Sequence, residues 1–546
     1  MKKYFILSAT SVVLCLLFSC NEDTSPSSSV SSVFSDNKFD AKSFSTRLKP
    51  ALQPVGTDSG RSKNSMIRDR IYSLYNTHEF APIWLSANGK TAYAEKLIKD
   101  LENVSTDGID PERYHLASLK KQLDAYKTSE VVEVGDVISL DTGLTGNYLR
   151  ASRELLMGMI APRSVDSLWF HANDTVWNTT SLLTVLKAGE YPSLDSYRSK
   201  LHEYALMRTS LAHYKTLSQN DSLITLRKAL SADPSSDSNA ASVIALEAPW
   251  LNSISDTLYG AASKIQAYQQ YFGLKRTGKL DSTTLGKLRK SPSDMVKLIS
   301  ANLERMRWLP QSLGEEYVIV NIPTMEMKLV RGNNTAIKMN VVVGKPSRQT
   351  PVLNAEMANV VFNPPWGVPP TILKKDVVPG VMRSGGAYLR KKGLEAFDAK
   401  GKRVDASAVT GGNYRRYFFR QPPGHSNALG YVKFNFPNKW DIYMHDTPHR
   451  EDFEKFDRAR SSGCIRLHHP QELAKYILNE IEGRDYQQEK IDSLISTHKT
   501  KFETLKNKIP VHILYLTAYD DGTGNHIRFA RDFYNRDAKL MAALSK

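Results

Sequence analysis

The stretch YVIVNIPTMEMKLVRGNNTAIKMNVVV, residues 317–343, decides the fold of the C-terminal half of the chain. Apolar residues alternate with polar ones along it, as in Met325, Met327 and Leu329 around Glu326 and Lys328. A period of two with many β-branched residues is typical of strands that bury one face. The pattern therefore predicts a sheet, with strands at Val318–Ile322, Ile337–Val343, Ala358–Phe362, Val432–Phe436 and Asp441–Met444.

A segment rich in Lys, Arg and Gly interrupts these strands at about residues 373–420. Two interpretations of this insertion stay open, a mobile lid over a site and a passive surface loop.

Before the strands, residues 46–240 have apolar positions at helical spacing and no catalytic constellation. This region is predicted to be a helical scaffold domain. Residues 231–240 (SADPSSDSNA) resemble a linker at its end.

A short module follows at residues 254–292, with the apolar spacing of a small helical bundle. It resembles the peptidoglycan-binding module, whose usual pattern is Phe-Gln, then Gly-Leu, then Asp-Gly. Here Tyr268-Gln269 stands for the first pair and Thr277-Gly278 for the last. The resemblance implies a wall-binding fold, and a degenerate spacer is the alternative.

The first residues have the pattern of a cleaved export signal. A basic start and an apolar run at residues 1–19 end at Ser19-Cys20, and a Ser- and Asp-rich segment follows. This resembles the lipobox of bacterial lipoproteins, which implies lipidation of Cys20 and a flexible tether over residues 20–45. The expected location is the cell envelope or periplasm, with the chain anchored in a membrane by lipid.

The chain has 546 residues, a formal net charge of +16 and a hydrophobic content of 41%. Such a length allows several packed domains. For an exported basic protein, wall polymer and lipid headgroups are more plausible partners than nucleic acid. Of the three cysteines, Cys15 lies in the expected signal and Cys20 would be acylated, which leaves Cys464 as the one thiol without a partner.

Cys464 follows His445 by nineteen positions, in the segments YMHDTP (443–448) and RARSSGCIRL (458–467). A thiol is mostly protonated at neutral pH and needs a base, which an imidazole provides. Gly463 lets the backbone turn tightly, so its N–H and that of Cys464 are candidates to face an oxyanion, in a loop that includes Ser462. These residues predict an acyl-transfer site, although a buried inert thiol is the alternative reading of a lone cysteine.

Other residues are candidates for binding substrate, each with a structural alternative. Arg466 could bind a substrate carboxylate or form an ordinary ion pair, and Asp446 could orient His445 through its carbonyl or simply sit in a turn. Tyr431, Lys433 and Trp366 could line a groove or pack in the sheet. No Cys/His/Asp spacing predicts a metal site, and no glycine loop predicts a phosphate-bearing cofactor, so none is expected.

The His-Asp and Ser-x-Gly-Cys-Ile-Arg segments resemble the active-site motif of the L,D-transpeptidases, with Ser462 where the commonest form has His. Further segments resemble the large multidomain, YkuD-type branch of that family and its scaffold, and even residues 511–534 resemble its closing strands. The quoted segments are Phe80–Trp84, Asp107–Pro111, Asn302–Pro310, Thr350-Pro351, Asn363–Trp366 and Asn427–Gly430.

The resemblance implies a multidomain α+β protein with a mixed-β catalytic domain at 316–475, completed by a C-terminal helix and strands at 476–546. Cys464 would attack the third residue of a tetrapeptide stem of peptidoglycan and release D-alanine, with His445 as base and acid. A diamino-acid amine of a second stem would then form a 3–3 cross-link. Inhibition by carbapenem-type β-lactams is also expected.

Three alternatives stay open. If water resolves the thioester, the enzyme is an L,D-carboxypeptidase. If the fold has lost activity, the chain is a wall-binding lipoprotein. A general cysteine peptidase of the papain type is disfavoured, because there Cys precedes His along the chain.

Overall fold

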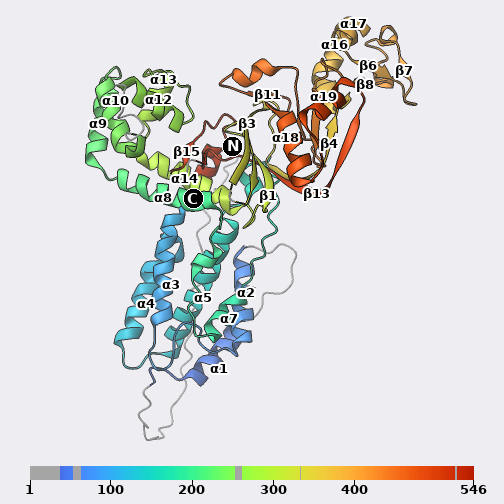
Figure 1. Ribbon diagram of the computed structural model, residues 1–546. Coiled ribbons are helices and arrows are strands. Elements are labelled where there is room, and N and C mark those ends of the chain that lie inside the picture. Colours follow the sequence, from blue (N-terminus) through green and yellow to red (C-terminus); the bar gives the residue numbers. More distant parts are fainter. Residues whose placement is uncertain (1–36, 53–62, 252–260, 333, 523–525) are drawn as a thin grey trace, which may run out of the picture.

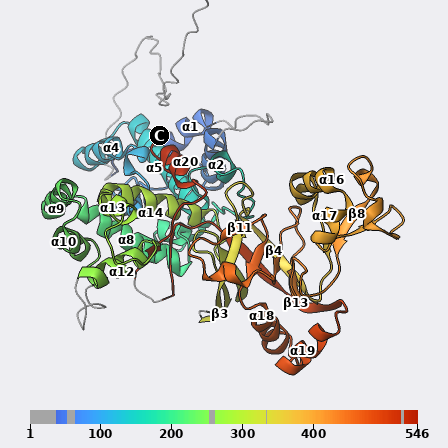
Figure 2. The ribbon, with the colours of Figure 1, turned by 90° about the horizontal axis from the view of Figure 1, so that it is seen from above.

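The computed structural model describes residues 37–52, 63–251, 261–332, 334–522 and 526–546. In Figure 1 long helices form a lower body, a β-sheet lies above them, and a small subdomain projects at the upper right. Figure 2 places a group of shorter helices on the opposite side of the sheet from that subdomain. A helical N-terminal region and a C-terminal mixed sheet are thus confirmed. The expected signal peptide and Cys20 lie outside the described residues.

The lower body consists of helices packed around one apolar core. A buried carboxylate orders its centre, since Asp141 accepts hydrogen bonds from the N–H groups of Ile83, Trp84 and Leu85 at 2.8–3.1 Å. The Phe80–Trp84 segment therefore serves packing of the scaffold. The helices are α1 (Ala41–Ala51), α2 (Lys63–Thr77), α3 (Ala92–Asn103), α4 (Leu116–Thr128), α5 (Val134–Met157), α6 (Pro162–Val165) and α7 (Ser181–Lys187).

The prediction of a tether up to residue 45 is wrong for its last residues. Helix α1 begins at Ala41, and Asp40 caps it by accepting from the N–H groups of Lys42 and Ser43. Phe44 and Leu48 are fully buried in the scaffold core. Their burial fixes this segment, which the Ser-rich composition upstream did not reveal.

A second group of helices follows the scaffold in sequence and lies above it in Figure 1: α8 (His202–Leu217), α9 (Asp221–Ala232), α10 (Asp237–Glu247), α12 (Ala261–Tyr271), α13 (Ser282–Leu288) and α14 (Pro292–Arg307). The linker predicted at 231–240 is wrong, because α9 and α10 are separated by a short turn. Ser236 caps α10 and Ala240 is buried, so the polar residues here end and start helices.

The residues that resemble the peptidoglycan-binding pattern hold the small module together. The Gln269 side-chain amide donates to the Thr277 and Thr284 hydroxyls at 2.8 and 2.9 Å. Its carbonyl accepts from the N–H groups of Thr277 and Gly278 at 2.8 and 3.0 Å. The glutamine therefore closes the loop between α12 and α13 from inside.

The main sheet has the order β11-β3-β12-β10-β9-β4-β13-β1-β2, and β2 also pairs with β3, so the sheet closes on itself. Strand β10 is shorter than predicted, because Asp441–Tyr443 lie in a loop before it. The strands are β1 (Glu316–Asn321), β2 (Glu326–Arg331), β3 (Asn334–Gly344), β4 (Leu353–Phe362), β9 (Val432–Asn435), β10 (Met444–His445), β11 (Ala459–Ser461), β12 (Ile465–Leu467) and β13 (Lys501–Leu514).

Strand β13 lies between β4 and β1 in the sheet, although it follows the other strands in sequence. Its partners pair antiparallel on one side and parallel on the other. The C-terminal part of the chain is therefore integral to the sheet. It also contains α18 (Pro470–Tyr476), α19 (Gln488–Ser496), β14 (Ala518–Tyr519), β15 (Arg528–Phe529) and α20 (Asp537–Leu544).

The insertion between β4 and β9 is a folded subdomain with its own apolar core. It spans residues 366–421, wider than the predicted 373–420, and is called the insertion subdomain below. A sheet of order β5-β8-β6-β7 packs against short helices. Its elements are β5 (Trp366–Gly367), α15 (Pro370–Ile372), α16 (Val378–Ser384), α17 (Gly386–Lys391), β6 (Glu395–Phe397), β7 (Arg403–Val404) and β8 (Phe418–Gln421).

Among the helices that the structure describes, none has the length and apolar character needed to cross a membrane.

Candidate active site

His445 ends the short strand β10, between β9 and β12. It pairs with Lys433 on one side and with Arg466 on the other, and its side chain is only 5% exposed. Its Nδ1 is hydrogen-bonded to the carbonyl oxygen of Asp446. Because a carbonyl only accepts, Nδ1 carries the proton and Nε2 keeps a free lone pair in the neutral ring.

The environment favours this neutral ring. Burial, together with the positive charges of Arg466 and Lys433, lowers the pKa of His445 to about 3. At neutral pH the imidazole is therefore neutral, with the lone pair of Nε2 free.

Asp446 supports the imidazole through its backbone, while its own carboxylate points into the protein. The carboxylate is fully buried and accepts from the N–H groups of Tyr431 and Thr447 at 2.8 and 2.7 Å. It also forms an ion pair with Arg450. Gly430 makes room for it: its φ is +60°, and a Cβ atom there would overlap the carboxylate. Asp446 is thus a positioning residue in this geometry.

Cys464 lies in the loop between β11 and β12 and is half-buried. Ile465, the next residue, pairs with Met444, and Arg466 pairs with His445. Since side chains alternate along strands, Cys464 and Arg466 share one face with Tyr443 and His445. The thiol donates to the carbonyl oxygen of Asp441 at 3.7 Å, and no direct contact with the imidazole is seen among the described residues.

The Cys464 thiol is protonated at rest. Burial raises its pKa, whereas hydrogen bonds from Tyr443 and the charge of Lys433 act in the opposite direction. The Tyr443 phenol contacts both the thiol and the Trp366 indole, and burial raises the pKa of Tyr443, so the phenol stays a donor. The thiol therefore needs a base, and the donors that would stabilise its anion are already beside it.

The loop that carries Cys464 differs in one respect from the sequence expectation. The Gly463 N–H donates to the Ser461 hydroxyl at 3.1 Å, so it is occupied and does not face an oxyanion. The Cys464 N–H has no acceptor among the described residues, which leaves it as the backbone donor for that role. Ser462 is exposed, and its hydroxyl accepts from Arg348 at 2.9 Å.

The remaining candidate residues separate into two groups. Trp366 and Lys433 line a cavity of about 390 Å³ next to Cys464. Arg466 forms an ion pair with Asp452 at 3.1 Å, and the Tyr431 hydroxyl lies 3.3 Å from His425, so both have structural partners.

The cavity carries opposite charges on its wall. The Lys433 ammonium lies 4.1 Å from the centre of the Tyr443 ring, and Asp441 also lines the cavity. Neither side chain forms an ion pair within the described part of the chain. The cavity can therefore take a polar ligand beside Cys464. No group of three or more His, Cys, Asp or Glu side chains in the described residues is arranged to hold a metal ion.

Comparison with known proteins agrees with this geometry. The YkuD family model, described as the L,D-transpeptidase catalytic domain, matches residues 315–511, a range that contains His445, Cys464 and the cavity. The chain carries an L,D-transpeptidase catalytic domain. A second model, described as a scaffold domain, matches residues 69–211.

A relative from Haemophilus influenzae, named "Putative L,D-transpeptidase", is 31% identical over 254 residues. The match covers 46% of this chain and 50% of the relative, so the chain spans about half of that relative's length in the comparison.

Sequence reasoning did not single out two residues that lie beside Cys464, Tyr443 and Asp441. Tyr443 precedes His445 by two positions, so strand alternation could have placed it on the same face. Asp441 has a φ of +53°, which turns its carbonyl toward the thiol. Asn438 holds this turn, because its side chain bonds to the backbone of Phe436, Trp440 and Ile442.

Thr350 stabilises the loop that carries Cys464 in the L,D-transpeptidase domain. Its hydroxyl donates to the Gly463 carbonyl at 2.7 Å and accepts from the Gly344 N–H at 2.9 Å. The Thr350 N–H donates to the Tyr534 hydroxyl at 3.1 Å, and that hydroxyl donates to the Gly344 carbonyl. The side chain is fully buried, so these bonds are shielded from water.

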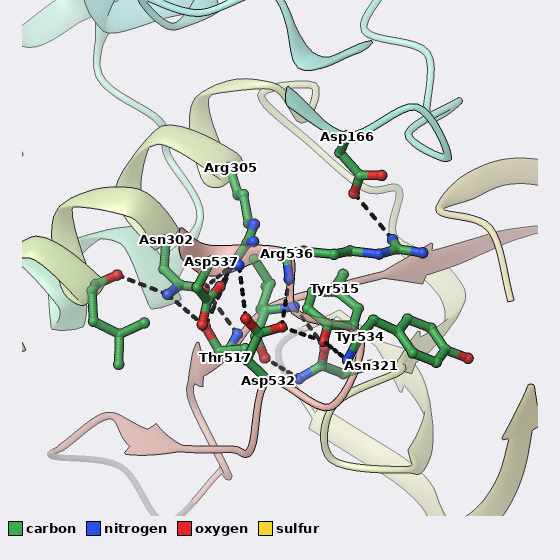
Figure 3. Close-up of polar contacts among 12 residues, drawn as sticks. Asp166, Asn302, Arg305, Asn321, Tyr515, Thr517, Asp532, Tyr534, Arg536 and Asp537 are labelled. Atoms are coloured by element: carbon green, nitrogen blue, oxygen red, sulfur yellow. Dashed lines mark hydrogen bonds and ion pairs between the residues drawn. The ribbon is translucent and has the colours of Figure 1, made fainter. Parts of the chain in front are cut away.

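A polar network extends this support to other parts of the chain (Figure 3). Arg536 forms a buried ion pair with Asp166 of the scaffold at 3.1 Å and stacks its guanidinium over Tyr515 and Tyr534. Asp532 accepts from the Tyr515 hydroxyl at 2.6 Å and from the Arg536 N–H at 2.9 Å. The C-terminal segment thereby connects the scaffold to the loop that holds Cys464.

Proposed function

We propose that the protein is a peptidoglycan L,D-transpeptidase. Cys464 loses its proton to Nε2 of His445 and attacks the carbonyl carbon of the third residue of a tetrapeptide stem. The bond to the terminal D-alanine breaks, and the departing amine takes the proton from His445. A thioester to Cys464 remains.

In the second half of the reaction, the side-chain amine of a diamino acid on another stem gives a proton to His445 and attacks the thioester. The C–S bond breaks, a 3–3 cross-link forms, and the thiolate recovers its proton from His445. The proton balance closes without any other acid or base.

The observation that carries this proposal is the arrangement of His445 and Cys464 on one face of the sheet. A buried imidazole with Nδ1 bonded to a carbonyl is a neutral base with one free nitrogen, and it shares a sheet face with the one cysteine in the described chain. The Cys464 thiol is protonated and has Tyr443 and Lys433 beside it, and both can stabilise the thiolate when it forms during the attack. The Cys464 N–H supports the resulting oxyanion.

The cavity beside Cys464 supports binding of the stem. Lys433 forms no ion pair with the residues that the structure describes and is suited to a carboxylate of the donor peptide, and Asp441 is suited to an ammonium group. Trp366 contributes an apolar wall. Gly463 and Ser462 shape the nucleophile loop, and Arg466 and Asp446 keep its surroundings in place.

The proposal extends to the cell envelope. Lipidation of Cys20 would anchor the chain to a membrane and bring the catalytic domain to the stem peptides. Carbapenem-type β-lactams would acylate Cys464.

Mass spectrometry of disaccharide-tetrapeptides incubated with the purified chain tests the proposal, with Cys464→Ala and His445→Gln as controls. Cross-linked dimers that require both residues support the transpeptidase. Tripeptide without dimer would replace it by an L,D-carboxypeptidase. Unchanged tetrapeptide with folded protein would favour a wall-binding lipoprotein without catalysis.

A further inference from the structure

The insertion subdomain carries half of the chain's net charge in about a tenth of its length. Residues 366–421 contain 12 Lys and Arg against 4 Asp and Glu, a net charge of +8, whereas the whole chain has +16. Each of these twelve cations is exposed. The charge is therefore concentrated in one subdomain and is available to a partner.

The acidic residues of the insertion subdomain do not neutralise this surface. Asp398 and Asp405 accept hydrogen bonds from the backbone of their own turns. Asp376 is paired with Arg348 outside the subdomain, and Glu395 is paired with Arg403 at 3.1 Å. Within the described residues, Arg403 is thus the single insertion cation with an ion pair.

One face of the small sheet combines aromatic and cationic side chains. Register places Phe397 opposite Phe418 and Glu395 opposite Arg420, on the face away from the buried Ala396 and Phe419. The rings of Phe397 and Phe418 stack at 5.5 Å, and Phe418 is 48% exposed.

The guanidinium of Arg420 lies 4.0 Å from the centre of the Phe397 ring. A groove of about 620 Å³ runs nearby, lined by the unpaired Arg390 together with Arg403, Glu395 and Asp405. Such a surface suits a polymer that carries carboxylates.

The position of the subdomain narrows the choice of partner. Trp366 and Pro369, at its base, line the cavity beside Cys464, so a polymer that enters the cavity lies along the subdomain. Helix α1 is the first described helix after the expected lipid anchor at Cys20, and it lies at the opposite end of the molecule from the insertion subdomain (Figure 1). Of its large apolar side chains, only Met382 and Phe418 are exposed among the described residues, which is little for insertion into a bilayer.

We propose that the insertion subdomain is a binding surface for peptidoglycan away from the reacting stem, with its cations on the free carboxylates of neighbouring stem peptides. This rests on the proposed function, because peptidoglycan is the polymer on which the catalytic domain would act. The surface holds the polymer by charge and guides a stem toward the cavity.

The test is co-sedimentation of the full chain carrying Cys464→Ser with purified sacculi, so that binding is measured without turnover. A quadruple variant, Lys400→Gln, Lys402→Gln, Arg415→Gln and Arg416→Gln, removes four exposed charges of the insertion subdomain. A matched control removes four exposed charges elsewhere: Lys42→Gln, Arg47→Gln, Lys121→Gln and Lys228→Gln.

The insertion variant is expected to bind about tenfold more weakly at low salt, since each exposed charge pair contributes modestly, and the difference fades as salt rises. The control keeps most of its binding, and sacculi with amidated carboxylates bind both variants equally weakly. Equal loss in the control would make this a general charge effect and overturn the proposal.

Unchanged binding of the insertion variant would also overturn it. Stronger binding of the parent to phosphatidylglycerol vesicles than to sacculi, lost in the insertion variant, would assign the surface to the membrane instead. Since no arm requires catalysis, a failure of this proposal is separate from a failure of the transpeptidase assignment.

Discussion

Replacing Thr350 by Val removes one buried hydroxyl while keeping nearly the same shape. It leaves the Gly344 N–H and the Gly463 carbonyl without their partners, at 2.9 and 2.7 Å from the lost oxygen. Each unsatisfied buried group costs about 1–3 kcal/mol, so the free energy of unfolding is expected to fall by about 4 kcal/mol. The Gly463 carbonyl also becomes free to turn, and with it the Cys464 N–H.

A shift of the nucleophile loop by about 1 Å reduces the rate of the chemical step roughly 100-fold. The expected result for Thr350→Val is therefore a large fall in kcat with little change in KM, measured on soluble tetrapeptides. Thr350→Ser keeps the hydroxyl and loses only a methyl group, so it is expected to retain most of the activity. Urea unfolding of the three proteins gives the stability difference.

A folded Thr350→Val protein with the parent's kcat would refute the role of this bond. So would equal losses for Val and Ser, because the serine variant keeps both hydrogen bonds. Tyr534→Phe provides an independent check, since it removes the partner of the Thr350 N–H from the C-terminal side. It should lower kcat in the same direction.

Three further predictions concern His445, Tyr443 and Gly430. Because the pKa of His445 is depressed from 6.5 to about 3, the folded state binds fewer protons than the unfolded state between these two pH values. The contribution of His445 to the free energy of unfolding is therefore complete above pH 6.5 and falls by about 1.4 kcal/mol per pH unit below it. In urea titrations from pH 7 to 4, this slope should be smaller for His445→Gln than for the parent. Tyr443→Phe removes a hydrogen-bond donor to the Cys464 thiolate, so the pH midpoint of alkylation by iodoacetamide should move upward. An unmoved midpoint would mean that Tyr443 does not stabilise the thiolate. Gly430→Ala places a Cβ atom against the buried Asp446 carboxylate at a φ of +60°, so activity should fall more than about tenfold and thermal stability should drop. Full activity would mean that the Asp446 backbone does not need this support.

The long strands could be predicted from sequence, because one buried face imposes strict alternation. Met327 and Leu329 are buried in β2 while Lys328 between them is not, as the pattern indicated. The prediction failed at Asp441–Tyr443, where Ile442 is apolar but the Asn438 side chain turns the backbone into a loop. Periodicity does not register a hydrogen bond from a side chain to the backbone.

The insertion subdomain escaped prediction for a different reason. Its strands are two to four residues long, too short for a period to emerge. Its core also depends on residues such as Val377, Leu389 and Phe419 that meet only in three dimensions.

His445 and Cys464 were found as candidates because a thiol and an imidazole, the groups that acyl transfer needs, stand in two short and recognisable segments of the sequence. Thr350 was noticed only as part of a resemblance, since its contacts to Gly463 and Tyr534 connect segments far apart in sequence. Asp441 acts through its carbonyl, and a backbone carbonyl is present at every residue. Such supports become visible only when the chain is folded.

The bond from Tyr534 to Thr350 has a consequence for how the protein is made. A chain growing on the ribosome contains Cys464 well before it contains Tyr534 and Arg536. Until those later residues have joined the fold, the Thr350 N–H lacks its Tyr534 acceptor, and the support behind the Gly463 loop is incomplete. If the proposed function holds, full acyl-transfer activity therefore requires the C-terminal segment to be in place, although Cys464 is made before it.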